Sequence, residues 1–143
     1  MSSLHRLIYT STRASYTDEA SIQQILTKAR PYNRQHNITG VLAYTTKRFL
    51  QYIEGDIEAL LALYERIAYD RRHYDLQLCD CAPIDERLFP HWQMAYRNLS
   101  ASCLVLQGSA NKHEEETFRQ VLQTSLRSPN QHLKVLRQFL LYQ

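Results

Sequence analysis

Residues 37–55, NITGVLAYTTKRFLQYIEG, constrain the fold more than any other stretch of the chain. Two apolar runs lie on either side of a short polar break at residues 44–48, a pattern typical of a β-hairpin that is buried on at least one face. We expect the turn at residues 45–47. Gln51 lies between apolar neighbours in the second strand, and a buried amide must find hydrogen-bond partners. Either this amide faces solvent at a strand edge, or it points at a bound ligand.

The rest of the first hundred residues alternates strand and helix patterns around this hairpin. We expect further strands at residues 4–10, 76–82 and 92–99, and amphipathic helices at residues 18–30 and 56–69. The resulting order, βαββαββ, predicts an α+β, ferredoxin-like fold with one added strand, in which two helices cover one face of a mixed sheet.

The helix boundaries follow from capping residues and a proline. Thr17 or Asp18 can cap the first helix, Asp56 can cap the second, and Pro31 is expected to end or kink the first. In the second helix, helical spacing predicts an inner face made of Leu60, Leu61, Tyr64, Ile67 and Ala68.

The pattern changes after residue 100. Residues 114–126 and 131–141 read as two amphipathic helices with Pro129 between them. A ferredoxin-like sheet leaves one face uncovered, so we expect this helical hairpin to cap it or to bind a partner. The predicted organisation is therefore a domain at residues 1–100 and a C-terminal extension at residues 101–143.

Composition narrows the function classes. The chain has 143 residues, and its 17 Lys and Arg against 14 Asp and Glu give a net charge of +3. This dispersed charge argues against nucleic acid or a membrane surface as a partner. No apolar run approaches the length of a membrane span, and the N-terminus lacks the apolar region of a signal peptide, so we expect a cytoplasmic protein. The three cysteines lack metal-site spacing, and no metal is expected.

Several polar side chains should converge between the two helices. The first and third strands of a ferredoxin-like sheet are commonly adjacent, which makes Tyr9 and Gln51 neighbours beneath the helices. Other residues expected around this slot lie on the helices or at their ends: Ile25, Asn33, Arg66, Ile67 and Asp70. A slot with apolar walls and a few polar groups at its rim suits a flat heteroaromatic ligand.

The chain also carries a set of family motifs over about residues 4–99. In order, these are Arg6-Leu7-Ile8-Tyr9, Asn37-Ile38-Thr39-Gly40, Phe49-Leu50-Gln51 with Glu54-Gly55, and Trp92-Gln93-Met94. Together, and at this spacing, they resemble the BLUF family of blue-light sensors that bind FAD. The resemblance implies a short, single-domain photoreceptor with no enzyme activity of its own.

The resemblance also implies roles for individual residues around the flavin. The ring would lie between the helices, with Ile25 and Ile67 against its faces and Asn33 hydrogen-bonded to its polar edge. Gln51 would bridge the flavin and Tyr9.

Further residues match positions that the family uses to hold the ring edge, the ribityl chain or the phosphates. These are Arg66, Asp70, Arg72 and His73. Tyr32 departs from the family, since relatives often have Asn or His there, and this affects the detail of the ribityl contacts. The adenine end has no clear motif, which leaves FAD or FMN open.

By the same resemblance, light drives electron and proton transfer from Tyr9. Gln51 relays the proton and then rearranges, by rotation or by tautomerisation, with an added hydrogen bond to the flavin. Trp92 and Met94 lie on the strand that changes its packing after light, although both can also be read as core residues. The signal would pass through the C-terminal helices to an unidentified partner protein, and a homo-oligomer is expected.

Three other readings compete with this one. An acylphosphatase-like hydrolase would use a phosphate-binding loop after the first strand, but residues 11–15 contain an arginine and no glycine. An RNA-binding module would require exposed aromatic side chains on a basic face. A flavin binder that has lost its light response is the third reading, and the retention of Tyr9, Gln51 and Met94 argues against it.

Overall fold

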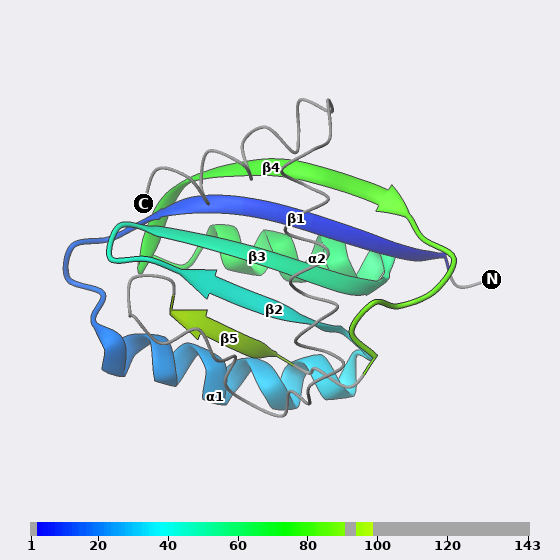
Figure 1. Cartoon of the computed structure of the whole chain (residues 1–143), viewed down its shortest axis with the longest axis horizontal. Helices are drawn as coiled ribbons and strands as arrows, with labels where there is room; N and C mark the ends of the chain where they lie inside the picture. The colour runs from blue at the N-terminus through cyan, green and yellow to red at the C-terminus, as the bar shows by residue number, and fades with distance from the viewer. Residues whose placement is uncertain (1–2, 91–93, 99–143) are drawn as a thin grey trace.

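The computed structural model describes residues 3–90 and 94–98 (Figure 1). Trp92, the predicted helices at 114–126 and 131–141, and the boundary proposed at residue 100 lie outside the described residues. In the described part of the chain, no helix is long and apolar enough to cross a membrane. No group of three potential metal ligands occurs there either.

In the described residues, five strands form one sheet, and two helices pack beside it. The elements are β1 (Leu4–Arg13), α1 (Glu19–Gln35), β2 (Thr39–Tyr44), β3 (Arg48–Asp56), α2 (Ile57–Ala68), β4 (His73–Pro83) and β5 (Ala95–Asn98). The strand order is β4-β1-β3-β2-β5, and only the β2–β5 pair is parallel. In Figure 1, α2 lies behind β1 and β3, whereas α1 runs along β2 and β5. The predicted ferredoxin-like α+β fold is confirmed.

The hairpin predicted from residues 37–55 forms β2 and β3, with its turn at 45–47. All six residues of β2 are buried, as expected for a strand near the middle of the sheet. Gly40 is required by close backbone approach, because a Cβ atom there would lie 2.0 Å from the carbonyl oxygen of Tyr52. The hairpin is therefore fixed by backbone contact as well as by its apolar pattern.

The start of each helix is as predicted, but the end of the first is not. Asp18 caps α1 by accepting the Ser21 N–H at 2.8 Å, and Asp56 caps α2. Pro31 does not end α1, which continues to Gln35. A proline inside a helix removes its own hydrogen-bond donor and crowds the carbonyl four residues before it, a cost that packing of the next turn can offset. The extra turn places Asn33 in the core, 1% exposed, and its packing offsets the missing bond.

The inner face of α2 differs from the prediction at three positions. Leu61 is 49% exposed and Ala68 is also exposed, whereas Leu63 is buried. The inner stripe runs through the buried Leu60 and Leu63 and the half-buried Ile67, spaced by three and four residues. Leu61 lies about 100° around the helix from Leu60 and therefore faces solvent.

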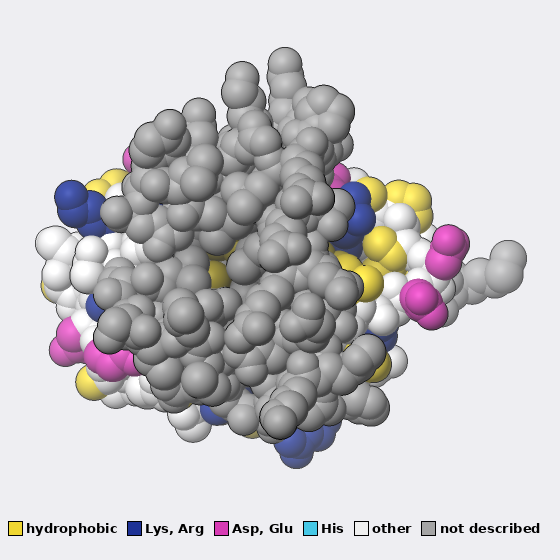
Figure 2. Space-filling view, in the orientation of Figure 1, with side chains coloured by type: hydrophobic (Ala, Val, Ile, Leu, Met, Phe, Trp, Pro, Cys, Tyr) yellow, Lys and Arg dark blue, Asp and Glu magenta, His cyan; other side chains and the backbone are white. Residues whose placement is uncertain are grey.

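The last two strands also differ from their predicted bounds. β4 begins at His73, three residues earlier than expected. β5 spans Ala95–Asn98, so Met94 precedes the strand instead of lying within it. The register between β1 and β4 shifts near Cys79, which is buried while Cys81 is exposed. In Figure 2, acidic and basic side chains are scattered around the rim of the visible face, in keeping with the small net charge.

Candidate functional site

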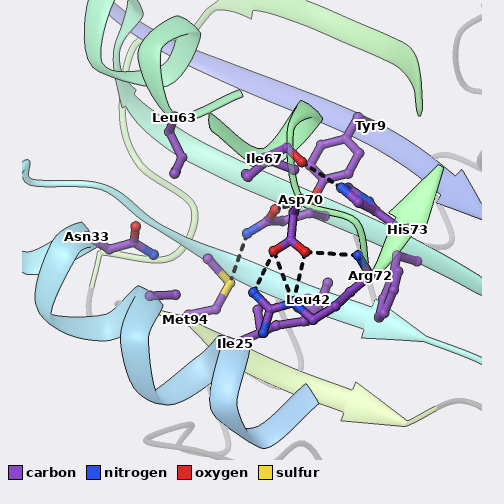
Figure 3. A pocket seen from close by; sticks show the side chains of 13 residues that line it. Tyr9, Ile25, Asn33, Leu42, Leu63, Ile67, Asp70, Arg72, His73 and Met94 are labelled. Carbon is purple, nitrogen blue, oxygen red and sulfur yellow. Dashed lines mark hydrogen bonds and ion pairs between the residues drawn. The ribbon is translucent and has the colours of Figure 1, made fainter. Parts of the chain in front are cut away.

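A pocket of about 580 Å³, counting its part open to solvent, lies between the two helices and the sheet (Figure 3). Helix α1 contributes Ile25, Ala29 and Asn33, which are spaced by four residues and so share one face. The other lining residues come from the sheet, from α2 and from the segments that follow them: Tyr9, Leu42, Phe49, Gln51, Leu63, Ile67, Asp70, Arg72, His73 and Met94.

Tyr9 and Gln51 are placed together by the strand register, in which they are direct partners on β1 and β3. The Tyr9 hydroxyl donates a hydrogen bond of 2.6 Å to Oε1 of Gln51. The amide nitrogen of Gln51 in turn contacts the Met94 sulfur at 3.5 Å. All three side chains are at least nine-tenths buried. They form a chain of contacts from β1 to the residue before β5.

Burial determines the protonation state of Tyr9. Desolvation raises the pKa of its phenol far above the ordinary tyrosine range, and the nearby Tyr64 and Asp70 act in the same direction. Tyr64 packs edge-on against the Tyr9 ring, with the centroids 5.6 Å apart. The phenol is therefore a neutral hydrogen-bond donor throughout the physiological pH range.

Asp70 and Arg72 form a charged pair in the wall of the pocket. The Arg72 Nε donates to Asp70 Oδ1 at 2.8 Å, and its Nη2 donates to Oδ2 at 2.5 Å (Figure 3). The guanidinium holds the pKa of the Asp70 carboxyl below its ordinary value. Both side chains are about 30% exposed, so the pair lies at the rim of the pocket.

His73 joins the end of α2 to the sheet. Its Nε2 lies 2.6 Å from the Ile67 carbonyl oxygen and must donate to it, since a carbonyl can only accept. In the neutral imidazole, Nδ1 then accepts from the Ser11 hydroxyl at 2.8 Å. These two bonds fix Ile67 against the pocket and assign the histidine tautomer.

Most of the residues singled out in the sequence line this pocket. Tyr32 and Arg66 do not, although they bridge the two helices: the Arg66 guanidinium lies 4.4 Å from the Tyr32 ring centroid. His36 also packs against Tyr32, with the two ring centroids 4.2 Å apart. The cofactor-binding roles of Tyr32 and Arg66 stay predictions.

Four lining residues were not predicted, although the sequence patterns contain signals for them. Ala29 lies midway between Ile25 and Asn33 in the helical repeat, and Leu63 precedes Ile67 by four residues. Phe49 shares the face of Gln51 two residues away on β3. Leu42 pairs with Gln51 across the hairpin, so finding it required the register.

The pocket fits a flat, heteroaromatic group of the size of a flavin ring. Its walls are mainly apolar, and a few amide and charged groups converge on it, as in sites that bind small molecules. The loop at residues 11–15, which an acylphosphatase-like hydrolase would use to bind phosphate, has its arginine engaged in other contacts. Its arginine, Arg13, donates to the backbone carbonyls of Thr17 and Thr45, each at 2.8 Å, and thereby ties the loop to the hairpin turn.

Comparison with known proteins agrees with this reading. The sequence model described as sensors of blue-light using FAD, BLUF, matches residues 4–95. Over 75 residues the chain is 44% identical to photoactivated adenylate cyclase subunit alpha of Euglena gracilis, covering 52% of this chain and 7% of that protein. Over 82 residues it is 34% identical to the blue light- and temperature-regulated antirepressor BluF of Escherichia coli (strain K12), covering 56% and 20%. The chain thus spans a small part of these relatives.

Solved structures give the same result over nearly the full chain. The dark-state structure of BlrB, a BLUF protein, has a TM-score of 0.66 at 29% identity, covering 94% of this chain and 96% of that one. The photo-activated state of BlsA has a TM-score of 0.67 at 30% identity, covering 98% and 96%.

Proposed function

Because the chain belongs to the BLUF family of blue-light sensors that use FAD, we propose that it binds FAD between α1 and α2 and signals through rearrangement of Gln51. The observation that carries this proposal is the 2.6 Å hydrogen bond between Tyr9 and Gln51 at the wall of the pocket. It places a neutral phenol and an amide that both donates and accepts beside one another, out of water.

Different residues of the chain would hold different parts of the cofactor. Ile25 and Ile67 would contact the two faces of the flavin ring. The buried Asn33 amide and the rim pair of Asp70 and Arg72 would hold its polar edge and side chain. Tyr32 and Arg66, stacked across the two helices, would face the phosphate and adenine half, which is what distinguishes FAD from FMN.

A bound flavin supplies a strong oxidant when it absorbs blue light. Tyr9 would give one electron to that oxidant, and its phenolic proton would move along the existing hydrogen bond to Oε1 of Gln51. The amide can pass a proton on because it carries both an acceptor and donors. The electron and the proton would then return to Tyr9, so that no atom or electron is gained or lost overall. The lasting change would be a new arrangement of the Gln51 amide.

That rearrangement alters what Met94 contacts. The Gln51 amide nitrogen faces the Met94 sulfur at 3.5 Å, so turning the amide would place its oxygen there, and tautomerising it would change the hydrogens on that nitrogen. Met94 leads directly into β5, which supports a signal that leaves through this strand. Trp92, two residues before Met94, would take part in the same change.

Beyond β5, residues 101–143 would carry the signal to a partner protein or to a second copy of the chain. Their apolar stripes, which include Leu133 and Leu136, support this role. Replacing both leucines with aspartate should abolish light-dependent partner binding while the photocycle persists. Unchanged binding would refute this part of the proposal.

Absorption spectroscopy of the purified protein before and after blue light tests the central proposal. We expect a flavin spectrum that shifts slightly to the red and recovers in the dark, and a Gln51→Leu variant that binds flavin without the shift. Chromatography of the released cofactor would distinguish FAD from FMN. A protein that takes up no flavin from added FAD would overturn the proposal.

A further inference from the structure

A buried carboxylate on the opposite face of the sheet forms a second polar cluster. Glu54 is fully buried and lies three residues after Gln51 on β3, so its side chain points away from the pocket. Its carboxylate accepts the backbone N–H of Leu88 at 2.7 Å and that of Phe89 at 2.9 Å. A buried charge is costly unless it is fully hydrogen-bonded, so these bonds matter to the local structure.

Arg87 completes this cluster from the same loop. Its guanidinium donates to the Thr39 hydroxyl at 2.8 Å, to the Glu54 carbonyl at 3.0 Å and to the Asn37 carbonyl at 2.6 Å. The Phe89 ring packs edge-on against Tyr52, with centroids 5.5 Å apart. We call Thr39, Glu54 and residues 87–89 the Glu54 clamp. It ties the loop between β4 and β5 to β2 and β3.

The clamp and the Gln51–Met94 contact close a ring. In one direction, Glu54 lies three positions after Gln51 on β3. In the other, Met94 lies five positions after Phe89 and contacts Gln51 again. The carbonyl of Met94 also accepts a bond from Arg30 of α1 at 3.3 Å. The position of Met94 relative to Gln51 therefore depends on where the clamp holds residues 87–89.

β5 itself adds little restraint. It has four residues and lies at the edge of the described sheet, paired only in parallel with β2. A short edge strand of this kind needs its entry point fixed by something else. The Glu54 carboxylate provides that fixed point, because it orients two successive backbone N–H groups at once.

We infer that Glu54 is a positioning residue for the light switch: by holding residues 87–89, it sets the barrier for exchange of the Gln51–Met94 contact without touching the flavin. The inference rests on the proposed photoreceptor function. In a Glu54→Gln variant, an NH₂ donor replaces the oxygen that accepts the Leu88 N–H at 2.7 Å, so this N–H keeps only its longer bond of 3.1 Å to Oε1, and both remaining bonds lose the charge of the carboxylate. The loosened loop lowers the barrier in both directions.

The test is the rate of dark recovery of the red-shifted spectrum in the flavin-loaded protein. We expect Glu54→Gln to bind flavin and to show the full red shift, but to recover at least about fivefold faster, as loss of part of a charge-assisted bond implies. Asp80→Asn is the matched control. It removes a carboxylate that bonds Arg6 at 2.7 Å between β1 and β4 and does not contact the loop.

The outcomes separate the two levels of inference. Recovery of Glu54→Gln within about twofold of wild type would overturn the clamp, as would equal acceleration in Asp80→Asn, which would indicate general destabilisation. A wild-type protein without any red shift would instead refute the photoreceptor proposal. Should Glu54→Gln fail to fold, Arg87→Met removes the outer half of the clamp, and the same acceleration is expected.

Discussion

Replacing Tyr9 with phenylalanine removes one oxygen atom and leaves the ring in place. In the wild type this oxygen donates to Oε1 of Gln51 at 2.6 Å, and both side chains are buried, at 3% and 7% exposure. In the variant the Gln51 oxygen loses this donor. An unsatisfied buried acceptor lowers the free energy of unfolding by about 1–3 kcal/mol. The aromatic contact of the Tyr9 ring with Tyr64 survives, so we expect a folded protein of reduced stability.

The same change removes the electron and proton donor beside the cofactor. The variant should bind flavin and show no light-induced red shift, because phenylalanine has no phenolic proton to give. Urea unfolding of the flavin-loaded protein measures the stability loss, and absorption spectroscopy measures the response. Tyr64→Phe is the matched control, and it should keep both stability and response. A full red shift in Tyr9→Phe would refute the assignment of Tyr9 as the donor, and a stability loss below about 0.5 kcal/mol would refute the hydrogen-bond argument.

Three further changes test other parts of the structure. Ala29→Leu should fill the pocket and reduce flavin content after purification by about tenfold or more, whereas Ala20→Leu, on the exposed face of the same helix, should not. Because its arginine partner lowers the pKa of Asp70, the pair stabilises the fold above the ordinary aspartate pKa and is lost as pH falls through the depressed value. As the pH falls, the free energy of unfolding of the wild type should therefore decrease by less than about 1 kcal/mol, a small value because the pair is partly exposed. Asp70→Asn should lack this decrease. Gly40→Ala should cost about 3 kcal/mol or more in urea unfolding, since its Cβ would meet backbone at 2.0 Å, whereas Gly55→Ala, with contacts at 3.4 Å, should cost about 1 kcal/mol or less.

The sequence predicted those parts of the fold that depend on neighbouring residues or on the common strand order of the fold class. The hairpin, both N-terminal helix caps and the adjacency of Tyr9 and Gln51 follow from apolar alternation, capping chemistry and a known strand order. The persistence of α1 beyond Pro31 did not, because the packing of the next turn outweighs one missing hydrogen bond.

Other features of the site depend on contacts between distant segments. Leu42 enters the pocket only through the register of β2 with β3, and Met94 reaches Gln51 from outside the strand in which it was expected. The Glu54 clamp gave no usable signal, since a glutamate in an apolar strand does not reveal which backbone N–H groups it meets. Tertiary placement of a loop decides that partner.

The order of strands in the sheet also has a consequence for how the molecule opens. Within the described sheet, β1 and β3, which carry Tyr9 and Gln51, are each hydrogen-bonded on both sides, whereas β5 is bonded along four residues to a single neighbour. Amide protons of β1 and β3 should exchange with solvent only on global unfolding, and those of β5 through local opening. In the proposed mechanism, a chemical event on two slowly exchanging strands would thus act on a strand of the described sheet that opens at a lower free energy.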